Sequence, residues 1–175
     1  MAKIIMIVAP EAYRDEELEV PKKHFESNGH DVAVASTKRG TCTGARGGTV
    51  EAVLTLDEIN VDDYDAVIFI GGPGTPAIRK EAKATSIAKE AAEKGKVVAA
   101  ICWACTTLAK SGILEGKKAT VWVGNDSEYG MTTDKVMEKF GAIFEKKGIV
   151  VDGKFVTADG PAHAKQFAEE IEKLL

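Results

Sequence analysis

Short runs of consecutive apolar residues alternate along the chain with longer stretches in which apolar residues recur every three or four positions. The first run, at 3–9, is apolar almost throughout, as expected for a strand covered on both faces of a parallel sheet. The next stretch places Leu18, Pro21 and Phe25 at helical spacing and ends in an Asn-Gly pair, which predicts a helix with a glycine after its C-terminus.

The same alternation continues to the end of the chain. The predicted strands span 3–9, 31–36, 64–70, 96–101, 119–123, 149–152 and 154–157, with a further strand or hairpin arm at 50–54. The predicted helices span 16–28, 75–94, 106–111 and 163–175, and glycine-rich turns lie at 40–48 and 71–74. This order predicts one doubly wound α/β domain over residues 1–175, with a mostly parallel sheet and helices on both faces.

Composition narrows the range of partners. The 175 residues are 45% hydrophobic and 29% charged, with a net charge of -4, which is typical of soluble globular proteins. This net charge gives no sign of the excess of positive charge that attracts nucleic acid or an anionic membrane. The apolar run at 3–9 is too short for a membrane span or a signal peptide. We therefore expect a cytoplasmic protein with neither nucleic-acid nor membrane partners.

Three features follow predicted strands at their carboxyl ends, where sheets of this class bind ligands: the segment after Ala9, the loop 71–74 and Cys102. Cys102 follows its strand without a loop, and a helix begins almost at once. Such a strand-to-helix elbow strains its apex residue and exposes it above the sheet. The free N–H groups of the helix N-terminus favour a thiolate, so we predict a reactive thiol of low pKa. A buried core cysteine is the alternative.

The odd count of three cysteines argues against a disulfide framework. Cys105 forms a C-x-x-C sequence with Cys102, so it could trap an oxidised Cys102 as a disulfide or simply pack as a small apolar residue. We assign no role to Cys42. His24 and His30 are expected on the surface, and no histidine shares metal-ligand spacing with the cysteines, so we expect no metal.

Several segments together resemble the ThiJ/PfpI family. They are the elbow and following helix at 99–120, the loop region at 67–74, and the segments 28–32, 54–58 and 156–161. The resemblance covers nearly the whole chain in order. It implies a flavodoxin-like or class I glutamine amidotransferase-like fold, a reactive cysteine at the elbow, and a homodimer or larger homo-oligomer.

The resemblance also implies roles for particular residues. Cys102 would be the nucleophile, and Glu17, four residues before Pro21, would be the carboxyl group beside it. Backbone N–H groups of Gly72 and Trp103 would bind the oxyanion. Many members of the family have a histidine directly after the cysteine, and this chain has Trp103. We therefore do not expect peptidase activity from an adjacent Cys-His pair.

The leading hypothesis is a cofactor-independent cysteine hydrolase or lyase that acts on small carbonyl or acyl substrates, as glyoxalase III and deglycase members of the family do. Cys102 would attack the carbonyl carbon, and Glu17 would carry the proton. Gly71 and His163 could face the same pocket. The alternatives are a redox or stress-response protein in which Cys102 is oxidised, with or without Cys105 as the resolving thiol, and a dithiol oxidoreductase.

Overall fold

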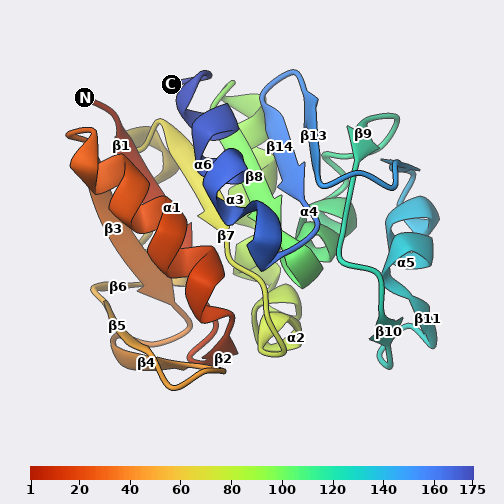
Figure 1. The fold of residues 1–175 in the computed structure, drawn as a ribbon, viewed down its shortest axis with the longest axis horizontal. Helices are drawn as coiled ribbons and strands as arrows, with labels where there is room; N and C mark the ends of the chain where they lie inside the picture. The colour runs from red at the N-terminus through yellow and green to blue at the C-terminus, as the bar shows by residue number, and fades with distance from the viewer.

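A seven-stranded sheet forms the centre of the computed structural model, which describes residues 1–175 (Figure 1). Its strand order is β13-β14-β8-β7-β1-β3-β6. The strands are β1 (Lys3–Ile7), β3 (Asp31–Ser36), β6 (Leu54–Thr55), β7 (Ala66–Phe69), β8 (Val97–Ile101), β13 (Ile149–Asp152) and β14 (Phe155–Ala158). Every neighbouring pair is parallel except β13 and β14. The predicted mostly parallel, flavodoxin-like sheet is confirmed.

The central strands β1, β7 and β8 are buried along almost their whole length, Lys3 being the one exposed residue. Helices cover both faces of these strands, which is why their sequences are apolar rather than alternating. Ile7 pairs with Phe69, and Phe69 pairs with Ala100, so the three strands end at nearly the same level. The segments that follow these strands therefore meet at one edge of the sheet.

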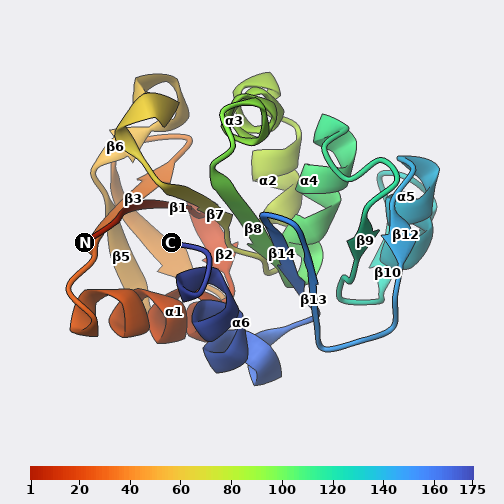
Figure 2. The same cartoon turned by 90° about the horizontal axis from the view of Figure 1, so that it is seen from above.

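Two helical layers enclose the sheet, each with its own hydrophobic core. Helices α1 (Asp15–Ser27) and α6 (Ala164–Glu172) lie on one face, and α2 (Thr75–Arg79), α3 (Ala82–Glu93) and α4 (Cys105–Ser111) lie on the other (Figure 2). Helix α5 (Thr133–Lys139) packs against α4 and extends that second layer. The core on the α1 side contains 22 buried residues, and the core on the α4 side contains 25.

The predicted helix 75–94 is wrong in one respect, because the chain forms two helices there. Helix α2 ends at Arg79, and extended backbone at Glu81, with ψ 119°, separates it from α3. The fully buried Arg79 side chain makes two hydrogen bonds to Asp126, 2.5 Å and 3.0 Å long. The break lets Arg79 point toward Asp126 while α3 continues along the sheet.

The predicted strand 119–123 is also wrong for most of its length. The strand β9 (Lys118–Ala119) pairs only with β12 (Ile143–Phe144), outside the main sheet. Beyond it, the backbone N–H of Thr120 donates to the Thr157 hydroxyl over 2.9 Å. The N–H of Trp122 donates to the carbonyl of Cys102 over 3.4 Å. These bonds replace strand pairing and bring Trp122 to the end of β8.

The glycine-rich stretch 40–48 is only partly the turn that we predicted. Its first half is a strand, β4 (Gly40–Gly44), which pairs with β5 (Thr49–Ala52) and with the short β2 (Glu11–Tyr13). The turn itself is held by the buried Asp15 carboxylate, which accepts hydrogen bonds from the N–H groups of Arg46 and Gly48 over 2.6 Å and 2.8 Å.

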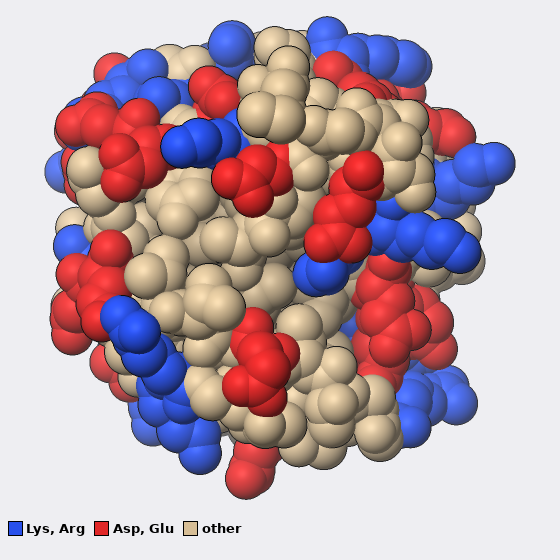
Figure 3. Space-filling model, turned by 90° about the vertical axis from the view of Figure 1, so that its left-hand side faces the viewer, with Lys and Arg blue, Asp and Glu red and all other residues tan.

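The remaining elements are short. They are η1 (Leu56–Glu58), η2 (Val61–Asp63), η3 (Cys102–Ala104), η4 (Pro161–His163), β10 (Asn125–Asp126) and β11 (Met131–Thr132). No helix combines the length and the apolar character needed to cross a bilayer. On the face drawn in Figure 3, acidic and basic side chains are interspersed around an uncharged centre. That face therefore carries no extended field of one sign of the kind that attracts nucleic acid.

Substituting Asp126 by alanine is expected to lower the free energy of unfolding by about 3–5 kcal/mol, because it leaves the buried charge of Arg79 without its main partner. Glu128 also pairs with Arg79, but its side chain is 43% exposed. Glu128→Ala is therefore expected to cost at most about 1 kcal/mol. Urea denaturation followed by circular dichroism measures both losses. Two small, equal losses would contradict the role of Asp126 as the main counter-ion.

Candidate active site

Cys102 stands at the end of β8 in the conformation that an elbow requires. Its φ of 63° lies in the left-handed region, which few residues other than glycine adopt. The residue is 9% exposed, and the short helix η3 begins at Cys102 itself and leads directly into α4. A backbone held in this region costs about 1–3 kcal/mol, which the surrounding packing must offset. The predicted strand-to-helix elbow is confirmed.

The loop after β7 lies against the elbow so closely that it needs glycine. A Cβ atom at Gly71 would lie 2.8 Å from the Cβ of Cys102 and 2.8 Å from a carboxylate oxygen of Glu17. At Gly72, where φ is +112°, a Cβ would lie 2.5 Å from the backbone nitrogen of Arg14. The missing side chains allow three segments to meet at the end of the sheet, with α1 providing Glu17.

The Glu17 carboxyl group is completely buried. Its Oε2 accepts a hydrogen bond from the N–H of Gly71 over 3.1 Å, whereas Oε1 is buried without a well-placed partner. Burial raises the pKa of Glu17 to about 7, although the adjacent Cys102 thiol, the Gly71 amide and the charge of Arg14 all act to lower it. A carboxyl group of this pKa can accept and return a proton near neutral pH.

The pKa of the Cys102 thiol is raised, contrary to the low value that we predicted. Burial and then the negative charge of Glu17 raise it, and the backbone N–H groups of Trp103 and Gly72 act in the opposite direction. The short helix that follows does not outweigh the loss of water around the sulfur. Cys102 and Glu17 form a coupled pair, in which the carboxylate is the group placed to take the proton from the thiol.

The side chain of Trp103 is held in place by the buried ion pair. Its indole N–H donates to Oδ2 of Asp126 over 2.9 Å, and the same carboxylate binds Arg79. The rings of Trp103 and Trp122 lie 5.4 Å apart between centroids. The two tryptophans therefore form an aromatic wall of the pocket that contains Cys102. We did not predict the ion pair, because its partners are far apart in the sequence.

Cys102 and Glu17 line a pocket with a volume of about 220 Å³. The lining residues are Arg14, Glu17, Gly72, Pro73, Cys102, Trp103, Trp122 and Pro161. Arg14 is the charged residue of this set that sequence reasoning missed. The only signal was its position between a strand end and a predicted helix, in a segment crowded with acidic residues.

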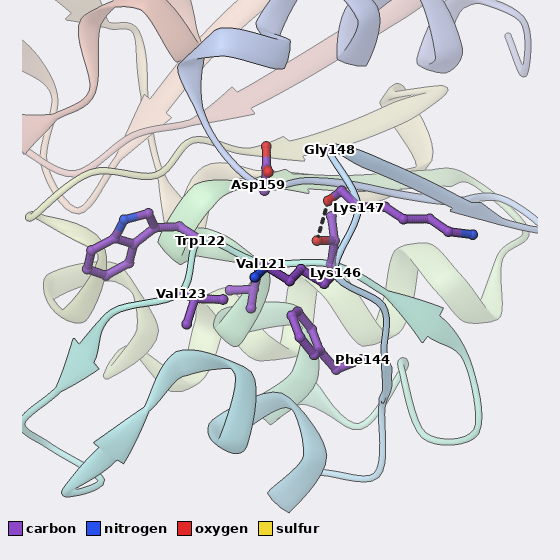
Figure 4. Close-up of a pocket in the computed structure, with 9 residues that line it drawn as sticks. Val121, Trp122, Val123, Phe144, Lys146, Lys147, Gly148 and Asp159 are labelled. Carbon is purple, nitrogen blue, oxygen red and sulfur yellow. Dashed lines mark hydrogen bonds between the residues drawn. The ribbon is translucent and has the colours of Figure 1, made fainter.

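A second hollow, of about 380 Å³, lies beyond Trp122, which lines both spaces (Figure 4). In Figure 4 the Lys146 side chain extends across this hollow toward Val121, and the Asp159 carboxylate points away from it. The lining residues of this hollow include neither a cysteine nor a serine. The nucleophile and the buried carboxyl group thus belong to the smaller pocket, to which we assign the chemistry.

Cys105 and His163 do not join the pocket. The thiol of Cys105 points to the carbonyl oxygens of Ala100 and Ala158, 3.3 Å and 3.5 Å away. It belongs to the core on the opposite face of the sheet from Cys102, and all three cysteines are free. His163 binds Asp159 over 2.6 Å and is not among the residues that line the pocket. The resolving role that we considered for Cys105 therefore lacks support from this geometry.

The two other histidines, which we expected on the surface, are partly buried and bind Glu172 at the end of α6. Nδ1 of His30 accepts a hydrogen bond from the N–H of Ala2 over 3.0 Å. In the neutral ring, Nε2 therefore carries the hydrogen and donates a hydrogen bond to Glu172. No imidazole thus reaches Cys102. No group of three or more histidine, cysteine, aspartate and glutamate side chains is arranged to hold a metal ion.

The fold and the site together define a class of α/β protein in which a cysteine on a strand-to-helix elbow lies beside a buried glutamate. Residues 2–174 match the model of the DJ-1/PfpI family, and the chain belongs to that family.

Similar proteins come from archaea and bacteria. An uncharacterised protein of Methanocaldococcus jannaschii, MJ0967, is 41% identical over 99% of this chain and 82% of its own length. Deglycase PfpI of Pyrococcus furiosus is 34% identical over 99% of each chain. The crystal structure of a ThiJ/PfpI domain protein from Brachyspira murdochii, 30% identical, superimposes with a TM-score of 0.90 over 98% of this chain and 95% of that one.

Ionisation of Glu17 is expected to destabilise the fold as the pH rises. Because its pKa is raised in the folded protein, from 4.5 to about 7, the folded state holds the proton more tightly than the unfolded chain. The resulting stabilisation is present below the unfolded pKa and is lost as pH rises through about 7. A shift of this size corresponds to about 3 kcal/mol.

Glu17→Gln removes this titration while keeping the shape of the side chain. The stability of the variant relative to wild type should therefore increase between pH 4.5 and pH 7. Denaturant unfolding at several pH values measures the difference. Glu16→Gln, at the partly exposed neighbouring position, is the control and should show no such increase. A constant difference between Glu17→Gln and wild type would contradict the raised pKa.

Proposed function

We propose that this protein is a cysteine-dependent enzyme that acts on small carbonyl compounds, of the glyoxalase or deglycase type. One observation carries the proposal: a cysteine and a buried carboxyl group of near-neutral pKa share a pocket of about 220 Å³ with two backbone donors. A relative that is 34% identical bears the name deglycase, which agrees with this chemistry.

The proposed reaction on a 2-oxoaldehyde begins when the sulfur of Cys102 attacks the aldehyde carbon. An S–C bond forms, Glu17 takes the thiol proton, and the carbonyl electron pair moves onto oxygen. The N–H groups of Gly72 and Trp103, two residues that line the same pocket, would stabilise this oxyanion. Glu17 then returns the proton to give a hemithioacetal.

Transfer of a proton from the former aldehyde carbon to the neighbouring carbonyl carbon, through an enediol, converts the hemithioacetal into a 2-hydroxy thioester. Hydrolysis of the thioester releases a 2-hydroxy acid and restores the thiol. For methylglyoxal the overall change is addition of one water molecule to give lactate. The aldehyde carbon is oxidised and its neighbour is reduced, so no external oxidant or reductant is required.

The same geometry argues against a peptidase. The residue after the nucleophile is Trp103, whose indole is bound to Asp126. A histidine base is not within reach, since all three histidines bind carboxylates elsewhere. The tryptophan wall also narrows the pocket, which favours small substrates over peptides.

Purified protein is expected to convert methylglyoxal to lactate without added glutathione. Cys102→Ser should abolish this activity, and Glu17→Gln should lower kcat at least about 100-fold, because it removes the only acid-base group in contact with the sulfur. Enzymatic assay of lactate measures both.

Cys42→Ser and Glu26→Gln are the matched controls, since Cys42 is buried away from the pocket and Glu26 is an exposed residue of α1 that binds Lys22 outside the pocket. Both should retain activity. No turnover by wild type, or full activity in Cys102→Ser, would refute the proposed function.

A further inference from the structure

Arg14 contributes a cationic group to the wall of the Cys102 pocket that the reaction proposed above does not use. It directly precedes α1, and its backbone N–H donates to the carbonyl oxygen of Gly71 over 2.9 Å. That bond ties Arg14 to the same loop that contacts Cys102. The backbone of Arg14 therefore has a fixed place relative to the elbow.

The guanidinium of Arg14 is only partly committed to other protein groups. Its Nε donates to Glu16 over 2.5 Å. Neither terminal nitrogen makes a hydrogen bond to the protein, and neither is buried. The Glu16 contact orients the planar group and leaves one edge free, with two parallel N–H donors of the kind that bind a carboxylate or phosphate in bidentate fashion.

The positive charge of Arg14 interacts with the two reacting groups, Glu17 and Cys102. It acts to lower the pKa of Glu17, and its own pKa is raised, first by the hydrogen bond to Glu16 and in part by the charges of Glu17 and Cys102. Of the eight residues that line the pocket, Arg14 is the only one with a positively charged side chain. The rest of the wall is largely apolar, so a ligand anion would find its counter-ion at Arg14.

We infer that Arg14 determines specificity by binding a negatively charged group of the substrate, so that the substrate class is small aldehydes or 2-oxo compounds that carry a carboxylate or phosphate near the carbonyl. This inference rests on the proposed function for its biological meaning. The carbonyl group would lie at Cys102, between the N–H groups of Gly72 and Trp103, and the anion would lie against the free edge of Arg14.

Alkylation of Cys102 tests this inference without any need for turnover. Iodoacetate and iodoacetamide react in the same way: the sulfur forms a bond to carbon, the C–I bond breaks and iodide leaves. They differ in that only iodoacetate is an anion. The measured quantity is the ratio of their rates at Cys102, read by peptide mass spectrometry at one pH and divided by the same ratio for free cysteine.

For wild type, the normalised ratio of the iodoacetate rate to the iodoacetamide rate is expected to exceed one. Arg14→Gln should lower this ratio about tenfold, because a tenfold change corresponds to the loss of one charge-assisted hydrogen bond of about 1.4 kcal/mol. Arg14→Lys, which keeps the charge and loses the planar fork, should give an intermediate ratio. Arg39→Gln is the matched control, because it removes an exposed arginine that binds Glu58 outside the pocket. Its ratio should stay at the wild-type value.

Protection by reversible ligands supplies the second measurement. Glyoxylate, an anionic aldehyde, should protect Cys102 from iodoacetamide at lower concentration than methylglyoxal does, and Arg14→Gln should remove that advantage. Equal ratios in Arg14→Gln and Arg39→Gln, or a loss of reactivity in Arg14→Gln that affects both reagents equally, would overturn the inference. If wild-type Cys102 prefers iodoacetate but the protein forms no lactate, the proposed function is refuted, whereas the inference that Arg14 binds an anion is supported.

Discussion

The buried contact between the Glu17 carboxyl group, the N–H of Gly71 and the thiol of Cys102 depends on almost every other feature of the fold. Helix α1 must enter at the end of β1, and β7 and β8 must end level with each other. The loop after β7 must also lack a side chain at Gly71, because a Cβ there would lie 2.5 Å from the carbonyl oxygen of Ile101. These conditions remove water from the carboxyl group, which is why its pKa approaches neutrality.

Several groups at this end of the sheet cost stability. Cys102 and Ala12 are the two residues other than glycine with positive φ, and both belong to segments that meet the glycine loop. The carboxyl group of Glu17 is buried with one oxygen unpaired. Two apolar cores, one on each face of the sheet, offset these costs. Strain and buried polar groups that persist in this way are typical of sites retained for chemistry.

The alternation of apolar runs and amphipathic stretches was sufficient to predict the class of fold, because strand burial and helix amphipathicity are local properties of the sequence. Cys102 could be predicted for the same reason, since an elbow is a strand followed at once by a helix. Arg79 shows the limit of such reasoning. Within its own helix it looks like a solvated basic residue, and its burial depends on Asp126, 47 residues later in the chain. The break between α2 and α3 and the early end of β9 follow from contacts of this long-range kind.

The sequence by itself determined the buried central strands, the first and last amphipathic helices, the glycine turn at 71–74, and the position of a cysteine at an elbow. Only the tertiary structure decided the protonation chemistry of the site. The pKa of Glu17 depends on how completely α1 and the Gly71 loop exclude water. The opposite faces taken by Cys102 and Cys105 depend on how the elbow turns above the sheet. Likewise, Arg14 faces the pocket only because the segment before α1 packs on the loop after β7. Exclusion of water and long-range contact are properties of the packed molecule, and a local pattern of residues does not contain them.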